Sequence, residues 1–178
     1  RYPANSYDWR TNTAFTTSGN RLQYRSSVLG TAYDSQALAY YLSDQIFGTL
    51  PRSQYTNNGQ YNLRVGDVVV FGNNNAGLVT SVTNNNSFTC TTLYTSLSGW
   101  STATAGWSQS GNLSLYSSGS VTIYTRYPSS TTSSGSYNNA ASGTLVNGAQ
   151  PTESNASSLL NSKAAVGSYW GNNTSYRS

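Results

Sequence analysis

Apolar side chains between positions 33 and 48 recur with the period of an α-helix. The residues of this apolar face are Leu38, Tyr41, Leu42 and Ile46. Their spacing of i, i+3, i+4 and i+8 places them on one side of a helix. Asp34 belongs to the residue types that cap helix starts, and Gly48 to the type that ends helices. The pattern therefore predicts a helix over 33–48, capped by Asp34 and ended at Gly48.

Beyond this helix the pattern changes to short runs of β-branched, aliphatic and aromatic residues. These runs are 63–71, 77–83, 87–95, 112–118 and 120–127. Asparagines at 73–75 and 84–86 separate some of them, and Asn is common in turns because it tolerates left-handed backbone. The sequence predicts an α+β fold over residues 1–128, with one main helix packed on an antiparallel sheet or small barrel. We expect Leu38 and Leu42 of the helix to be buried against the strand residues Val68, Val70 and Val79. Residues 1–30 show no clean period, so we expect an irregular lead-in there.

The composition changes after residue 128. Residues 129–178 are rich in Ser, Asn and Gly, with a weak apolar group that includes Leu159 and Leu160. Such a composition predicts a linker-like C-terminal arm. Ordering it would cost about 1–2 kcal/mol per residue, so we expect it to lie against its own domain or a neighbouring molecule. We also expect the arm to mediate a homo-oligomer, and its deletion to leave a folded core.

The surface implied by the composition is polar but nearly uncharged. Only 8% of residues are charged, against about 25% in an average protein. Fifteen Tyr and many Asn, Ser and Thr suit sugar surfaces and subunit interfaces. The nine basic residues are scattered, which argues against nucleic-acid binding. No apolar run approaches the length of a membrane span, so we expect no membrane insertion.

The amino terminus bears on localisation. The chain contains no Met, and Arg1 is most simply the first residue after removal of a signal peptide. We therefore expect a secreted, extracellular or cell-surface protein. Its single cysteine excludes an internal disulfide.

Three sequence stretches resemble one enzyme family. The helix that opens with YDS at 33–35, the strand LRVGDVVVF at 63–71 and the strand NAGLVTSV at 75–82 resemble the papain-like cell-wall hydrolases of the NlpC and CHAP type. The resemblance covers residues 33–95. In that family the helix opens with an Asp-Cys or similar pair, and a His starts the strand after the Gly-Asp turn. The helix dipole stabilises the thiolate, and the imidazole acts as its base.

The resemblance places other residues at the catalytic positions. Ser35 stands at the cysteine position, Asn75 at the histidine position, and Thr91 or Thr92 near the third polar position. Serine needs a base more than cysteine does, yet the chain contains no His and Asn75 cannot accept a proton. We therefore expect a catalytically inactive relative, a pseudoenzyme. A hydrolase that uses Ser35 with an unrecognised base remains an alternative.

Other candidate sites are weaker. With no His, one Cys and five dispersed acidic residues, we expect neither a metal site nor a cofactor. Asp34 and Asp67 have cap and turn roles, which disfavours a glycosidase pair. Cys90 lies in an alternating strand and is expected to pack in the core. The aromatic residues that could form a sugar-stacking face are Tyr94, Trp100, Trp107, Tyr116, Tyr124 and Tyr127, with packing in the core and across strands as the alternative.

The sequence therefore favours a structural role over an enzymatic one. Our preferred hypothesis is a non-catalytic, self-assembling extracellular or cell-surface subunit of a filament or layer. The first alternative is a module that binds peptidoglycan or another glycan. The second is the Ser35 hydrolase.

Overall fold

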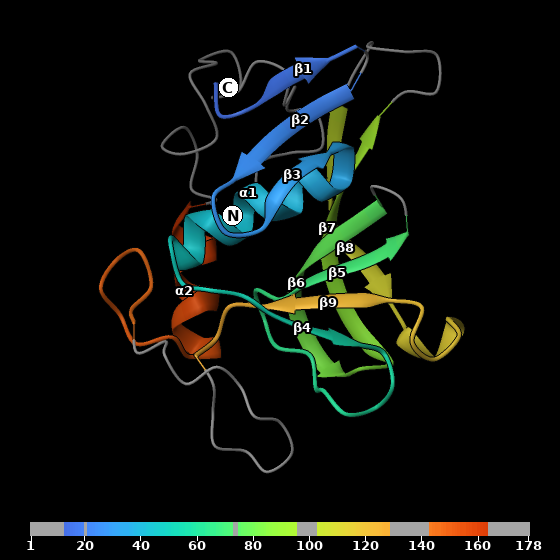
Figure 1. Ribbon diagram of the computed structural model, residues 1–178. Helices are drawn as coiled ribbons and strands as arrows, with labels where there is room; N and C mark the ends of the chain where they lie inside the picture. The colour runs from blue at the N-terminus through green and yellow to red at the C-terminus, as the bar shows by residue number, and fades with distance from the viewer. Residues whose placement is uncertain (1–12, 20, 73–74, 96–102, 129–142, 164–178) are drawn as a thin grey trace.

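The computed structural model describes residues 13–19, 21–72, 75–95, 103–128 and 143–163 (Figure 1). These residues form two antiparallel sheets and two α-helices, which confirms the predicted α+β class. The elements in chain order are β1 (Thr16–Ser18), β2 (Arg21–Ser26), β3 (Gly30–Tyr33), α1 (Asp34–Phe47), β4 (Ser53–Thr56), β5 (Val68–Gly72), β6 (Asn75–Asn84), β7 (Ser87–Thr95), β8 (Ala103–Gly111), the 3-10 helix η2 (Leu113–Leu115), β9 (Thr122–Thr125) and α2 (Glu153–Lys163). Within the described ranges, no helix is long and apolar enough to span a membrane.

The larger sheet is open. Its six strands run in the order β4-β9-β5-β6-β7-β8, so β4 and β8 form its edges in the described part of the chain. Strands β5 to β8 follow one another as a meander, in which β5, β6 and β7 correspond to predicted strands, and β9 returns to pair between β4 and β5. The sheet alternative is therefore the correct one, because the described strands do not close into a barrel.

Helix α1 lies between the two sheets. It contacts β2 and β3 on one side and β5, β6 and β7 on the other (Figure 1). Leu38, Leu42 and Ile46 are fully buried, as the helical period predicts. Because the helix is covered on both sides, Ala37, Ala39 and several other residues off this face are buried as well, as expected for a helix inside a core.

The end of α1 matches the sequence prediction. Gly48 has φ 60°, a left-handed value that a residue with a Cβ rarely adopts. Its amide donates to the carbonyl of Asp44 at 2.9 Å, which closes the last turn.

Alternation along the strands divides the core into two clusters. Val68 and Leu78 face α1, whereas Val69 and Val79 point to the opposite face and pack with Phe88, as period-two side chains must. The expectation that Leu38 and Leu42 pack on Val68 and Val70 agrees with this cluster. The expected contact with Val79 is wrong, because that side chain lies on the other face.

The predicted strands are confirmed in part. Strand β7 has the predicted bounds, and β6 and β9 differ from theirs by a few residues. The strand predicted over 63–71 starts only at Val68, because the preceding residues form a turn around buried Asp67. Strands β4 and β8 were not predicted.

The strand predicted over 112–118 is wrong. The side chain of Asn112 accepts a hydrogen bond from the Ser114 amide at 2.9 Å and starts the 3-10 helix η2. Leu113 is buried in the second cluster, while Leu115 is 78% exposed. Leu113 is therefore a core residue and Leu115 a surface residue, and the two do not share the buried face of a strand.

The N-terminal region is more regular than expected. Strands β1, β2 and β3 form a three-stranded antiparallel sheet, so the expectation of an irregular lead-in is wrong for residues 16–33. Leu22 and Ala32 are buried against α1 and anchor this small sheet. Residues 1–12 lie outside the described residues.

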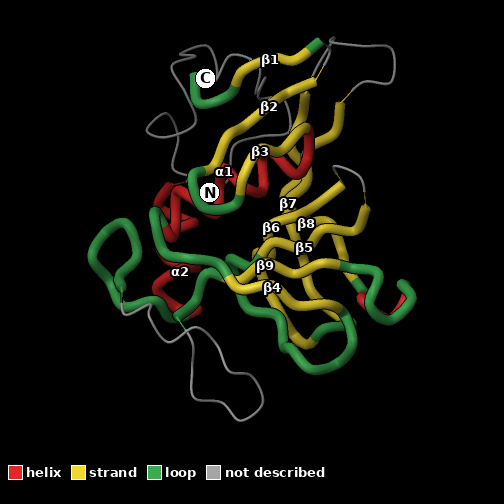
Figure 2. The backbone as a smooth tube through the Cα atoms, viewed as in Figure 1, coloured by secondary structure: helices red, strands yellow, loops and turns green. Residues whose placement is uncertain are grey.

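Part of the predicted arm is built into the core. Leu145 and the α2 residues Ala156, Leu159 and Leu160 are buried in the same cluster as α1, and Figure 2 shows α2 beside that helix. The amide of Val146 also donates to the carbonyl of Ile46 at 3.0 Å. Segments 129–142 and 164–178 of the predicted arm lie outside the described residues.

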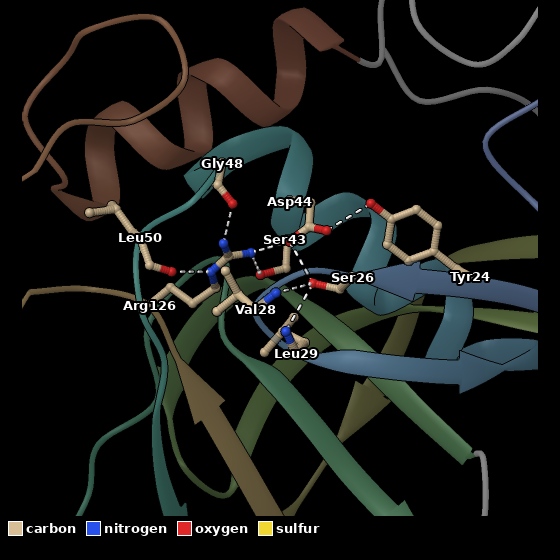
Figure 3. A network of polar contacts seen from close by, with 9 residues as sticks. All are labelled: Tyr24, Ser26, Val28, Leu29, Ser43, Asp44, Gly48, Leu50 and Arg126. Atoms are coloured by element: carbon tan, nitrogen blue, oxygen red, sulfur yellow. Dashed lines mark hydrogen bonds and ion pairs between the residues drawn. The ribbon is translucent and has the colours of Figure 1, made fainter.

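A buried polar network joins three elements at the end of α1 (Figure 3). Arg126, which follows β9, is 1% exposed and forms an ion pair with Asp44. Its guanidinium also donates to the carbonyls of Gly48 and Leu50 and to the Ser43 hydroxyl. On the other side, the carboxylate of Asp44 accepts from Tyr24 and Ser26, two side chains of β2, at 2.7 and 3.0 Å.

Candidate functional site

The candidate site predicted by the resemblance lies where β3 runs into α1. Asp34 opens the helix with φ 55°, the one left-handed non-glycine residue among those described. Its carboxylate accepts from Arg21 Nε at 3.1 Å and from the Leu22 amide at 3.3 Å. The expected N-cap role of Asp34 is wrong: Tyr33 occupies the N-cap position and provides no side-chain bond. The carboxylate ties the helix start to β2 instead.

Ser35 follows directly and is closed to solvent. Its side chain is buried, with the residue 5% exposed, and its hydroxyl oxygen accepts a hydrogen bond from the Ala76 amide at 3.0 Å. The chain thus brings the two predicted positions together, because Asn75 and Ala76 begin β6 beside the start of α1. Asn75 itself is exposed.

The third position implied by the resemblance, a polar residue that orients the catalytic base, corresponds to Thr91 or Thr92. Thr91 is fully buried, and its hydroxyl has no hydrogen-bond partner among the described residues. The side chain of Thr92 lies outside the described part of the structure. Since the chain contains no His, no imidazole can take the proton of Ser35.

Cys90 is a core residue, as its strand position indicates. It is buried in the second cluster, where burial raises the pKa of its thiol to about 11. A Cβ at Gly77 would lie 2.7 Å from its sulfur, so the thiol packs directly on that glycine. Its thiolate would be scarce at neutral pH, which excludes Cys90 as an activated nucleophile.

The Gly-Asp turn carries a buried carboxylate with a structural task. Asp67 is fully buried and accepts from the Tyr61 hydroxyl and the Arg64 amide, both at 2.8 Å. Burial raises its pKa to about 7. Gly66 has φ 96°, and the ring of Phe47 lies where a Cβ would stand, at 2.9 Å. The turn is therefore fixed by packing, and Asp67 is sealed inside it.

The described residues do not bring the expected sugar-stacking aromatic residues together on one face. Tyr124, on β9, makes an edge contact with Tyr40 of α1 at 6.1 Å between ring centroids, and the guanidinium of Arg52 lies 4.7 Å from its ring. Strands β5 and β6 separate β9 from β7, which carries Tyr94. The side chains of Tyr94 and Trp107, and the whole of Trp100, lie outside the described part.

A second polar region, which the sequence did not predict, lies away from Ser35. Two hollows of about 330 and 400 Å³ flank the segment after β8. The lining of the first hollow includes Asn57, Asn85, Ser114 and Tyr116. The lining of the second includes Ser81, Thr83, Thr89 and Ser110. Asn86 borders both hollows. The sequence signals in this region are the asparagine run at 84–86, which predicts a turn, and Tyr116, one of the aromatic residues considered for sugar stacking.

Other classes of site find no support in the described residues. No group of three His, Cys, Asp or Glu side chains there could hold a metal ion. Comparisons of the chain with protein-family models, with curated proteins and with solved structures found no match.

Proposed function

We propose that this chain is a non-catalytic structural protein, a self-assembling extracellular or cell-surface subunit. In this proposal its core resembles an NlpC or CHAP-type hydrolase whose catalytic positions have been replaced. Two observations support it: the closed Ser35 position argues for the absence of catalysis, and the uncharged outer edge of β8 argues for assembly.

The absence of catalysis rests on the contacts of Ser35. A nucleophilic hydroxyl must be deprotonated by a neighbouring base and must reach the substrate. The Ser35 oxygen instead accepts from the Ala76 amide inside the core. Asp34, the adjacent carboxylate, is paired with Arg21. Ser35 is only 5% exposed, and the chain has no His that could act as its base.

We expect purified protein to release no muropeptides from peptidoglycan above background. Ser35→Cys is expected to remain inactive as well, because the new thiol would still lack an imidazole base. Chromatography of digested cell-wall sacculi measures the release, with Ser35→Ala as the matched control. Turnover by the unmodified protein that Ser35→Ala abolishes would contradict the proposal.

Assembly is supported by the contrast between the edge strands. Edges of natural sheets are commonly short or guarded by charge or proline. Strand β4 has four residues and follows Pro51 and Arg52, and β1 has three. Strand β8 has nine residues, ATAGWSQSG, without charge or proline. A second copy of the chain is the partner that such an edge suits, through strand pairing. Segments 129–142 and 164–178 are candidates for additional contacts.

We expect Thr104→Lys with Ser108→Lys to convert oligomers into monomers, because two charges on β8 oppose pairing with an identical edge. Analytical ultracentrifugation measures the mass, and a thermal melt verifies folding. Ser154→Lys with Ser158→Lys adds the same charge to exposed positions of α2 and is expected to leave the oligomer unchanged. A monomeric unmodified protein, or full assembly by the β8 variant, would overturn the role of this edge.

A further inference from the structure

The two hollows beside the segment after β8 adjoin on one surface, because Asn86 borders both. We call this surface the loop-end groove and define it by Asn86, Ser114, Tyr116, Ser81 and Ser110. The first hollow lies between the loop after β4, the β6–β7 turn and the 112–118 segment. The second lies over the ends of β6, β7 and β8. Each hollow, at about 330 and 400 Å³, is at the small end of the size range of ligand sites.

The walls of the groove are held in place by the half-buried side-chain amides of two asparagines, Asn57 and Asn85. Asn57 Nδ2 donates to the carbonyl of Ser117 at 3.1 Å, and its Oδ1 accepts from the Val121 amide at 3.0 Å. Asn85 accepts from the Leu63 amide and donates to the carbonyl of Tyr61, both at 2.8 Å. Three segments distant in sequence are thus locked together before any ligand arrives, which lowers the entropic cost of binding.

The groove offers hydrogen-bonding groups without charge. Among the described residues, no Asp, Glu, Lys or Arg lines either hollow. On the sheet side, the Thr89 hydroxyl lies 2.8 Å from that of Thr80 and 2.6 Å from that of Ser81, which forms a row of linked hydroxyls. A charged ligand would lose hydration here without gaining an opposite charge. An uncharged ligand with many hydroxyl groups matches this surface.

An aromatic ring completes the groove. Tyr116 is 39% exposed, and its ring lies 5.1 Å from that of Phe71, measured between centroids. The neighbouring Leu115 borders the second hollow and is largely exposed. A ring supported from one side can contact the apolar face of a pyranose while neighbouring amides and hydroxyls bind the sugar's hydroxyl groups.

We propose that the loop-end groove binds a neutral oligosaccharide. The site is separate from Ser35 and touches only the end of β8, the strand on which the proposed assembly rests, through Ser110 and Gly111. It adds a ligand to the proposed structural role. Binding uses Asn86 and the surrounding hydroxyls for hydrogen bonds and Tyr116 for ring contact.

The test is isothermal titration of the full chain with chitohexaose, cellohexaose and maltohexaose, and with an oligogalacturonate as the acidic comparison. We expect binding of at least one neutral hexasaccharide and at least tenfold weaker binding of the acidic one. Absence of binding by all three neutral sugars, or equal binding of the acidic one, would overturn the proposal.

Two variants localise the site. Asn86→Asp keeps the oxygen that accepts from the Ser114 amide but removes the amide donor and adds a charge, so we expect at least tenfold weaker binding. Asn84→Asp makes the same change at a residue that lines neither hollow and is expected to bind as the unmodified chain does. Tyr116→Ala is expected to weaken binding at least tenfold, and Tyr116→Phe to retain it. Unchanged binding by both Asn86→Asp and Tyr116→Ala would place the sugar elsewhere.

Discussion

A chain that ends at residue 128 is expected to lose its cooperative thermal unfolding transition. The deletion removes α2 and the turn before it, including three buried leucines, Leu145, Leu159 and Leu160. A single buried Leu→Ala change costs about 2–5 kcal/mol, and the whole stability of a domain is about 5–15 kcal/mol. Removing all three side chains and uncovering their partners on α1 therefore takes away most of the stability. This result would reverse the expectation from composition that residues 129–178 can be deleted without harm.

The matched control is a chain that ends at residue 163. It retains every described residue and is expected to unfold at the temperature of the full chain. Circular dichroism at increasing temperature measures both transitions. If the chain that ends at residue 128 unfolded cooperatively at the same temperature as the full chain, the contribution of α2 to the core would be refuted.

The parts of the fold that the sequence predicted are those with a strong period. Helix α1 carries four large apolar residues at helical spacing and ends at a glycine, and both features have direct structural counterparts. Strand β7 alternates the buried residues Phe88 and Cys90 with Thr89, and the predicted bounds of 87–95 match those of the strand. Each of these elements shows its burial in its own sequence.

The elements that were missed depend on partners distant in sequence. Strand β1 has three exposed residues and is defined only by its pairing with β2. Helix α2, ESNASSLLNSK, has few apolar residues, and these become significant only against α1. Strand β8 shows no apolar alternation and is recognised through its ladder with β7. Local sequence carries little of this information, because the stabilising contacts are tertiary.

The candidate sites differ in the same way. Ser35 lies beside the start of β6, where its hydroxyl oxygen accepts from the Ala76 amide, and both residues belong to stretches that the sequence predicts as helix and strand. The loop-end groove draws its lining from three separate segments, and one of them had been assigned as a strand. Asn57 and Asn85 hold these segments together through hydrogen bonds to backbone groups distant in sequence, which local sequence patterns do not indicate.

Arg126→Met is expected to lower the free energy of unfolding by about 3–5 kcal/mol, the usual cost of removing one partner from a buried ion pair. Burial lowers the pKa of Arg126, while the neighbouring Asp44 acts in the opposite direction and favours the charged form. Methionine fills much of the space but leaves the carboxylate of Asp44 and the carbonyls of Gly48 and Leu50 without their donor. Urea denaturation of the variant and the unmodified chain measures the loss.

Two further substitutions serve as comparisons. Arg52→Met is a control outside the network, and Arg126→Lys separates the geometry of the network from its charge. Arg52→Met removes an exposed guanidinium that lies over the Tyr124 ring and is expected to cost about 1 kcal/mol or less. Arg126→Lys keeps the positive charge of the buried site but supplies one compact ammonium in place of a planar fork that reaches Asp44 and two carbonyls. We therefore expect Arg126→Lys to lose more than half of the stability that Arg126→Met loses. A lysine variant as stable as the unmodified chain would show that charge alone suffices, and that the fork geometry does not hold β9, α1 and β2 together.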